Sequence, residues 1–344
     1  MLSTLRRVLM RGLVVITILS TFTGCSFESG VTSDLHDYAE RLSRVVGTDL
    51  IYHSPVATLN YPAENQLVWP LQTFEISLTE FYSLQPCQIG SLVAERNTTL
   101  GKQQDQAAAF AYEVSLVNTL NDCILSLDDE HSQLAEKLQD WQRVKRQQLP
   151  KVWANMIQSV RENRLAFSKS TELLSVERED DDSAGVTALA YLVGLSAATD
   201  VRLDELNRQL KILDASRLPA KLWRTQNLLA ARLNDLTTAL NVALPNVSCE
   251  NGRASEQAEI LRNVFYLFFI EKIQPVGSRL NHLHYQLTPV LELLQTSPSI
   301  QPAFKQYIEA RNSEFRTYQS AMSEHVKLWQ TFLGRCHLSP QKPG

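Results

Sequence analysis

The fold of this chain is decided by a long apolar stripe in the stretch FKQYIEARNSEFRTYQSAMSEHVKLWQTFL, residues 304–333. Its large apolar side chains recur every three or four positions, which places them on one face of an α-helix. The members of the stripe are Phe304, Tyr307, Ile308, Phe315, Tyr318, Met322, Val326, Trp329, Phe332 and Leu333. The spacing predicts a helix over residues 300–335 that packs one face against other helices.

The same helical period recurs through most of the chain. It predicts further helices over residues 34–46, 71–84, 88–100, 105–127, 131–160, 184–214, 219–244 and 254–295. Proline lacks the N–H that an inner helical turn needs, so we expect an interruption at Pro150 and kinks or breaks at Pro275 and Pro289. Residues 264–270 are hydrophobic all round, which predicts a helix buried inside a bundle.

No segment alternates apolar and polar residues with the period of two that a half-buried strand requires. The predicted fold class is therefore all-α, a multi-helix bundle of antiparallel helical hairpins. Residues 48–70 are the exception, because Pro55, Pro62 and Pro70 make them an extended segment. The all-α domain is expected over residues 71–336, either undivided or as two sub-bundles divided near residues 177–184.

The acidic run over residues 177–183 marks that division. A like-charged run usually forms a solvated loop, and its acids also suit the first turn of the next helix. A calcium loop needs alternating oxygen ligands around a central glycine, which this run lacks. No calcium site is expected here.

The N-terminus indicates export. Arg6, Arg7 and Arg11 precede a short apolar segment over residues 13–19, and Gly24-Cys25 follows, an arrangement that resembles a bacterial lipoprotein signal peptide over residues 1–24. Cys25 is then the lipidated first residue of the mature chain, and residues 25–70 form a tether followed by the extended segment. Ser26, where Asp would favour retention, predicts the periplasmic face of the outer membrane.

Two other interpretations of the N-terminus stay open. An ordinary signal peptide cut near Gly24 would leave Cys25 as a free thiol. A retained membrane anchor would need about 20 predominantly apolar residues, and residues 12–25 fall short of that.

Composition limits the partners. The whole chain has a net charge of −4; residues 1–24 carry three Arg and no acid, so the remainder has 30 basic and 37 acidic residues, a net charge of −7. Such a charge disfavours nucleic acid as a partner. The expected partner is the membrane itself, through the N-terminal lipid anchor.

Four cysteines beyond Cys25 predict two disulfides, for which three connectivities exist. Cys87 and Cys123 flank two predicted helices whose midpoint falls in the loop at residue 105. Cys249 and Cys336 bracket the last two long helices in the same way. We therefore predict the bridges Cys87–Cys123 and Cys249–Cys336.

Polar residues gather in the first of these predicted hairpins. The midpoint that relates Cys87 to Cys123 also places Arg96 opposite Glu113, and Glu95 and Asn97 lie beside Arg96. These four residues are either a structural cluster with an Arg96–Glu113 ion pair or a site for a ligand carboxylate or sugar.

A second arginine stands out in the last helix. Arg311 interrupts the apolar stripe there, and a buried arginine needs a partner. Glu271 is the partner we expect from the symmetry of the second hairpin.

The first hairpin also carries a family resemblance. Cys87, the run Glu95-Arg96-Asn97-Thr98-Thr99-Leu100-Gly101, Tyr112-Glu113 and Cys123 resemble the signature of an uncharacterised, domain-of-unknown-function family of proteobacterial lipoproteins. The resemblance is strongest over about residues 60–125 and extends loosely to the whole chain. It implies a lipoprotein and assigns no activity.

No catalytic motif stands out. There is no nucleophile elbow, phosphate-binding loop, dinucleotide fingerprint or zinc-protease motif. His282 and His284 would point apart on a helix, so no metal is expected, and no cofactor.

Three function classes remain. The first is a non-enzymatic interaction or structural module of the cell envelope, with an envelope protein or peptidoglycan as partner. The second is a carrier of a lipid or small amphiphile, with residues 265–269 as a pocket wall. The third is a cell-wall or lipid hydrolase.

Overall fold

The computed structural model describes residues 30–74, 77–84, 87, 89–98, 105–176, 179–250 and 253–339. These residues form helices and no strand, so the all-α prediction is confirmed. Cys25 and the expected signal peptide over residues 1–24 lie outside the described residues. None of the described helices is both long and apolar enough to cross a membrane.

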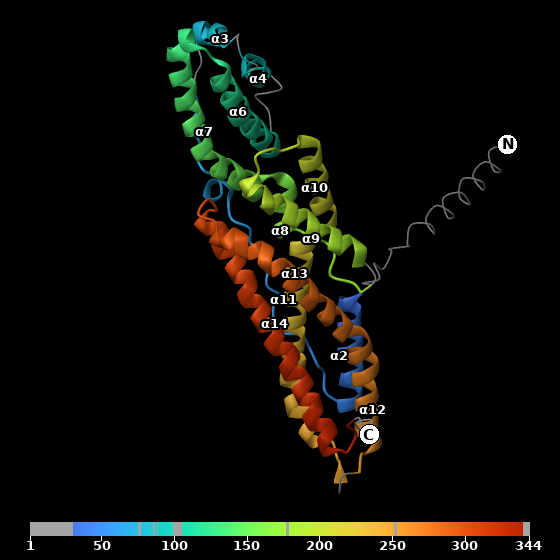
Figure 1. The fold of residues 1–344 in the computed structure, drawn as a ribbon. Coiled ribbons are helices and arrows are strands. Elements are labelled where there is room, and N and C mark those ends of the chain that lie inside the picture. Colours follow the sequence, from blue (N-terminus) through green and yellow to red (C-terminus); the bar gives the residue numbers. More distant parts are fainter. Residues whose placement is uncertain are drawn as a thin grey trace, which may run out of the picture.

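The helices assemble into an elongated body (Figure 1). One end holds α3 (Leu78–Ser83), α4 (Ile89–Arg96), α6 (Gln106–Ser126) and the start of α7 (Ser132–Ser159). The middle holds α8 (Arg161–Ser168), α9 (Glu179–Gly194) and α10 (Leu203–Ser216). The other half is built from α2 (Val31–Val46), α11 (Leu218–Ala243), α12 (Glu256–Val264), α13 (Gln274–Thr296) and α14 (Pro302–Arg335).

The predicted interruption at Pro150 is wrong, and neither Pro275 nor Pro289 breaks its helix. Pro150 lies inside α7, which continues from residue 132 to 159, and Pro289 lies inside α13. Pro150 is exposed, so water can bond the carbonyl group that loses its helical partner there. Pro275 follows a π-helical stretch over Phe265–Ile273 and lies in the first turn of α13, where the missing N–H of proline is tolerated.

One helix boundary and one burial pattern also differ from the prediction. Residues 184–214 form two helices, α9 and α10, joined by a short 3₁₀ turn over Leu195–Ala197. The leucine spacing suits a continuous helix as well as a broken one, so the pattern cannot report this break. The stretch 264–270 is not buried all round, because Leu267 is 50% exposed while Phe269 is fully buried.

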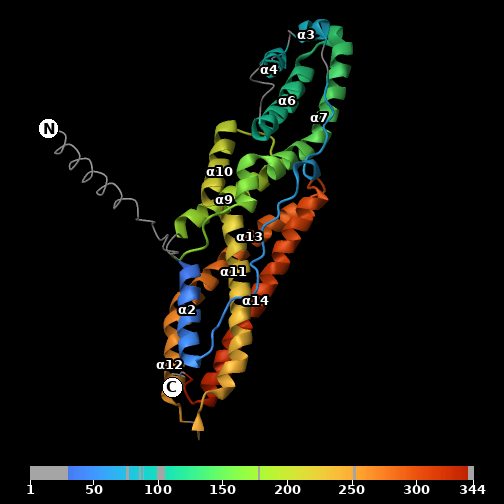
Figure 2. The same ribbon diagram turned by 180° about the vertical axis from the view of Figure 1, so that it is seen from behind.

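An extended segment, residues 48–74, runs along the bundle and is called the strap below. Figure 2 shows it passing alongside α11 and α14 on its way from α2 to α7. Asp235 of α11 accepts hydrogen bonds from the backbone N–H groups of His53 and Ser54, at 2.9 and 3.0 Å. Further along, Trp69 and Asn155 of α7 exchange two hydrogen bonds, at 2.7 and 3.0 Å. Backbone groups that would be unpaired outside a helix or sheet are thus bonded by side chains of the bundle.

The main hydrophobic core is continuous from α2 to α14 and includes residues on both sides of positions 177–184. The last helix packs most extensively against α11. A second, smaller core lies at the α4–α6–α7 end and contains Leu84, Ile89, Val93, Leu116, Leu120, Cys123 and Leu138. The α4–α6–α7 end of the molecule therefore has a small hydrophobic core of its own, separate from the main core.

A histidine lies in the middle of the main core. His325 is fully buried, and its Nε2 accepts a hydrogen bond from the indole N–H of Trp329 at 3.1 Å. Indole can only donate, so Nδ1 carries the proton and faces the Thr237 hydroxyl at 2.9 Å. Tyr38 contacts the same Nε2 at 3.0 Å. Burial lowers the pKa of His325 to about 3, which keeps the ring neutral.

This neutral ring predicts a pH-dependent stability. Below pH 6.5 the unfolded chain protonates His325 and the folded chain does not, so stability is lost as the pH falls from 6.5 toward 3. We expect His325 to account for about 2 kcal/mol of lost unfolding free energy between pH 7 and 5. Urea unfolding at several pH values measures this loss. His325→Gln should flatten the dependence of the unfolding free energy on pH, and the control His36→Gln, at an exposed site, should not. An equally steep pH dependence in His325→Gln would contradict the assignment.

Candidate functional site

The structure pairs the cysteines as predicted. Cys87 is bonded to Cys123 and Cys249 to Cys336, with Cα–Cα distances of 5.3 and 5.1 Å. The first bridge ties the residue just before α4 to α6. The second ties the segment after α11 to the end of α14. The first bridge thus joins the segment before α4 to α6, and both of these helices line the first cavity described next.

One cavity, called the distal pocket, lies where α4, α6 and α7 meet, with a volume of about 630 Å³. Aliphatic, aromatic and polar side chains all contribute to its lining. The lining residues are Thr73, Phe74, Ile89, Val93, Arg96, Asn97, Tyr112, Glu113, Leu116, Leu120, Trp141 and Lys145. Three of the four residues that the sequence singled out therefore line one pocket. The fourth, Glu95, is exposed and does not line it.

The predicted Arg96–Glu113 ion pair is wrong. Glu113 instead bonds Lys145 of α7, with Nζ 2.7 Å from Oε1, and both side chains are largely buried. Arg96 and Glu113 form no ion pair among the described residues, and the Arg96 guanidinium lies 5.6 Å from the Tyr112 ring centre. The sequence argument missed Lys145 because it considered only the α4–α6 hairpin, whereas α7 closes the pocket from outside it.

Aromatic rings and cations alternate around this pocket. The rings of Phe74 and Trp141 lie 6.0 Å apart, and Lys145 Nζ lies 5.7 Å from the Phe74 ring centre. A cation over a ring face is attracted by its negative potential, so these contacts order the cationic side chains. Among the charged side chains of the lining, Arg96 and Lys145 are cationic and Glu113 is anionic.

The Glu113–Lys145 contact predicts a measurable coupling. Glu113→Ala and Lys145→Ala should each destabilise the protein, because each leaves the other charge poorly solvated. In the double variant the loss should be about 1 kcal/mol smaller than the sum of the single losses. Urea unfolding of the unaltered protein, the two single variants and the double variant gives this coupling energy. The same cycle with Arg96→Ala in place of Lys145→Ala serves as control, and strictly additive Glu113–Lys145 effects would refute the pairing.

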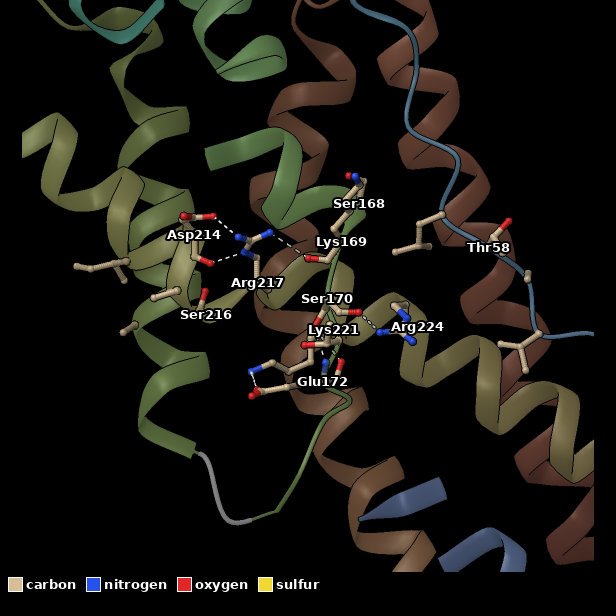
Figure 3. A pocket seen from close by; sticks show the side chains of 17 residues that line it. Thr58, Ser168, Lys169, Ser170, Glu172, Asp214, Ser216, Arg217, Lys221 and Arg224 are labelled. Carbon is tan, nitrogen blue, oxygen red and sulfur yellow. Dashed lines mark hydrogen bonds and ion pairs between the residues drawn. The ribbon is translucent and has the colours of Figure 1, made fainter. Parts of the chain in front are cut away.

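The larger cavity, called the central cavity, has a volume of about 1020 Å³ and lies between the strap and the ends of α8 and α10 (Figure 3). Residues 56–59 of the strap form one side and residues 168–172, the loop after α8, form another. Gly185 of α9 is packed so closely behind Ser216 that an added Cβ would lie 2.5 Å from its hydroxyl oxygen. Any larger residue there would clash with Ser216 and Leu218 unless the two segments moved apart.

Cations of the central cavity hold the loop after α8. Arg217 adopts a left-handed backbone, with φ 49°, at the junction of α10 and α11. Its guanidinium bonds Asp214 at 2.6 Å and the carbonyl of Lys169 at 3.3 Å, and Arg224 donates to the carbonyl of Ser170. Figure 3 shows these contacts converging on the loop. They fix a segment that lacks helical hydrogen bonds of its own.

Lys221 extends this arrangement into the interior. It is 4% exposed, and its Nζ lies 3.1 Å from Asp182 of α9 and 3.9 Å from Glu172. Asp182 is fully buried and also bonds Arg279 of α13 at 2.9 Å. The expectation of a solvated acidic loop is therefore wrong for Asp182, which joins three helices. The charge pattern alone gave no signal, because a buried acid and a solvated one look the same in sequence.

Other predicted positions are also placed by the structure. Arg311 is buried as expected, but its partner is Glu314, one turn along α14, and not Glu271. His284 stacks on Phe315, and burial lowers its pKa to about 4. No cluster of potential metal ligands occurs among the residues that the structure describes. Residues 265–269 line neither the distal pocket nor the central cavity.

Comparison with known proteins gives one match. A family model described as "Protein of unknown function (DUF3080)" matches residues 35–340, which include both cavities and all four bridged cysteines. Neither a curated protein nor a solved structure matches the chain.

Proposed function

The chain belongs to the family described as protein of unknown function (DUF3080), and because that description assigns no activity, we propose a function from its own residues. We propose that it is a lipid-anchored protein on the periplasmic face of the bacterial outer membrane that acts by binding and not by catalysis. It holds a small amphiphile in the distal pocket, in an envelope where other proteins or peptidoglycan are its neighbours.

Two observations support an envelope location. The sequence ahead of Cys25 has the basic, apolar and small-residue parts of a lipoprotein signal. The two disulfides suit an oxidising compartment, since thiols in the cytosol are kept reduced. Several acyl chains on Cys25 would anchor the protein stably, because two chains already suffice.

The composition of the distal pocket carries the binding proposal. Ligand pockets are typically about 300–1,000 Å³ and combine apolar surface with polar groups that orient the ligand; the distal pocket, at about 630 Å³, has a suitable size and both kinds of lining. Its aliphatic side chains and the rings of Phe74, Tyr112 and Trp141 suit an acyl or aromatic body. The cationic side chains of Lys145 and Arg96 suit a carboxylate head.

The arrangement of the acids favours binding over hydrolysis. Hydrolysis of a glycosidic bond needs two carboxylates facing the same bond. The carboxylates that line the two cavities each face a cation instead: Glu113 faces Lys145, Asp214 faces Arg217, and Glu172 faces Lys221. Carboxylates that are paired in this way hold cationic side chains in position, which is a role in binding and not in hydrolysis.

Titration with a fluorescent fatty acid, dansyl-undecanoate, tests the binding proposal on the full-length protein. We expect saturable binding that is lost in Asn97→Trp, which places a large ring at the exposed edge of the pocket, and weakened about tenfold in Arg96→Gln. Arg146→Gln, an exposed arginine of α7 outside both cavities, is the matched control. Equal binding by Asn97→Trp and the unaltered protein would overturn the proposal.

Labelling cells with a palmitate analogue tests the anchor. The unaltered protein should incorporate the label and fractionate with outer membranes, and Cys25→Ala should do neither. An unlabelled, soluble periplasmic protein would contradict the anchor.

A further inference from the structure

The described side chains that line the central cavity include more cations than carboxylates. Four cations and two carboxylates line it, namely Lys169, Arg217, Lys221, Arg224, Glu172 and Asp214. Arg217 is neutralised by Asp214 at 2.6 Å. Lys221 is neutralised together with Arg279 by the buried Asp182 and by Glu172. Among the described residues of the lining, two positive charges therefore remain without a carboxylate partner, in a chain whose net charge is −4.

The surplus cations are Lys169 and Arg224. No carboxylate within the described ranges pairs with either of them. Arg224 uses one Nη1 donor on the carbonyl of Ser170, and a guanidinium has five N–H donors in all. Figure 3 shows Arg224 beside the loop, with Thr58 of the strap beyond it. The other donors of Arg224 bond no group among the described residues, so they are available to a ligand that enters between the loop and the strap.

The loop adds neutral donors. The backbone N–H groups of Ser170 and Thr171 bond no acceptor in the part of the chain that the structure describes. The contacts from Arg217 and Arg224 hold this loop in place, so these amides are fixed before any ligand arrives. Preorganised N–H groups beside cations are the usual recognition elements for phosphate oxygens.

We propose that the central cavity binds a phosphate monoester, with Arg224 and Lys169 as its counter-charges and the amides of Ser170 and Thr171 as further donors. A phosphate monoester carries a charge of about −1.5 to −2 at pH 7, which matches two surplus cations better than one carboxylate does. The cavity, at about 1020 Å³, is much larger than a phosphate group, so the phosphate is attached to a larger polar body. The site is separate from the distal pocket and does not depend on the function proposed for it.

Calorimetric titration of the full-length protein with inorganic phosphate and with glycerol 3-phosphate tests the site. We expect saturable binding of both probes, weakened about tenfold in Arg224→Gln and in Lys169→Gln. The matched controls are Arg146→Gln and Lys211→Gln, which remove exposed cations outside the cavity and should leave the affinity unchanged. Thermal unfolding of each variant confirms that it is folded. Absence of saturable binding, or equal weakening in the controls, would overturn the proposal.

A third probe distinguishes the source of the phosphate. Short-chain, water-soluble dihexanoyl phosphatidic acid presents the same phosphate on a lipid. Tighter binding of this probe than of glycerol 3-phosphate, with loss in Arg224→Gln, supports a lipid headgroup as the ligand. Tighter binding of glycerol 3-phosphate, with the same loss, supports a soluble phosphate ester. Binding of both that is indifferent to Arg224→Gln would refute the site.

Discussion

Asp182→Ala is expected to lower the free energy of unfolding by about 3–5 kcal/mol, the typical cost of removing one partner from a buried ion pair. The carboxylate is fully buried between Lys221 at 3.1 Å and Arg279 at 2.9 Å, and both cations are themselves at least nine-tenths buried. Its removal leaves two positive charges facing each other with little water. Glu172, at 3.9 Å from Lys221, compensates only one of them and from a more exposed position.

A rescue variant distinguishes charge from packing. Replacing Asp182, Lys221 and Arg279 together by Leu, Met and Met removes all three charges and keeps most of the volume. It should recover much of the lost stability, since buried ion pairs are often no more stabilising than apolar residues. The surface control Asp204→Ala, which breaks the exposed Arg202–Asp204 pair, should cost far less. Urea unfolding measures all of these, and a loss below 1 kcal/mol for Asp182→Ala would contradict the buried network.

Removing the Cys249–Cys336 bridge should have an effect of similar size. The bridge closes a loop with a sequence separation of 87 residues, for which the loop-entropy estimate is about 4.5 kcal/mol. Cys336 is 1% exposed and belongs to the main core, so this loss falls on the whole bundle. The variant with both cysteines replaced by Ala should unfold at a clearly lower urea concentration.

The Cys87–Cys123 bridge provides the contrast. Its sequence separation is 36, and Cys123 belongs to the smaller core of the α4–α6–α7 end. Replacing both of these cysteines by Ala should lower hydrogen-exchange protection in α4 and α6 and leave α11 and α14 protected. Loss of protection throughout the chain in this variant, or no loss of stability without Cys249–Cys336, would contradict the assignment of each bridge to its own core.

The sequence by itself determined the all-α fold class, the buried face of the last helix and the cysteine pairs. The apolar period over residues 304–333 fixes which face of α14 is buried, because helical geometry relates positions three and four apart whatever lies opposite. Tyr307, Tyr318 and Trp329 are all buried as that period requires. The cysteine pairing could be predicted for a related reason. The two cysteines of each pair bracket predicted helices whose lengths can be counted along the chain.

Only the tertiary structure decided which charges meet. Lys145 bonds Glu113, and Asp182 is buried between Lys221 and Arg279, although no local pattern relates these positions. The strap and the loop after α8 enclose the central cavity through bonds to side chains of distant helices. A helical period reports which side of a helix faces inward, but it does not say which helix lies opposite. Ion pairs act over a few ångströms, so their partners are set by how the helices pack.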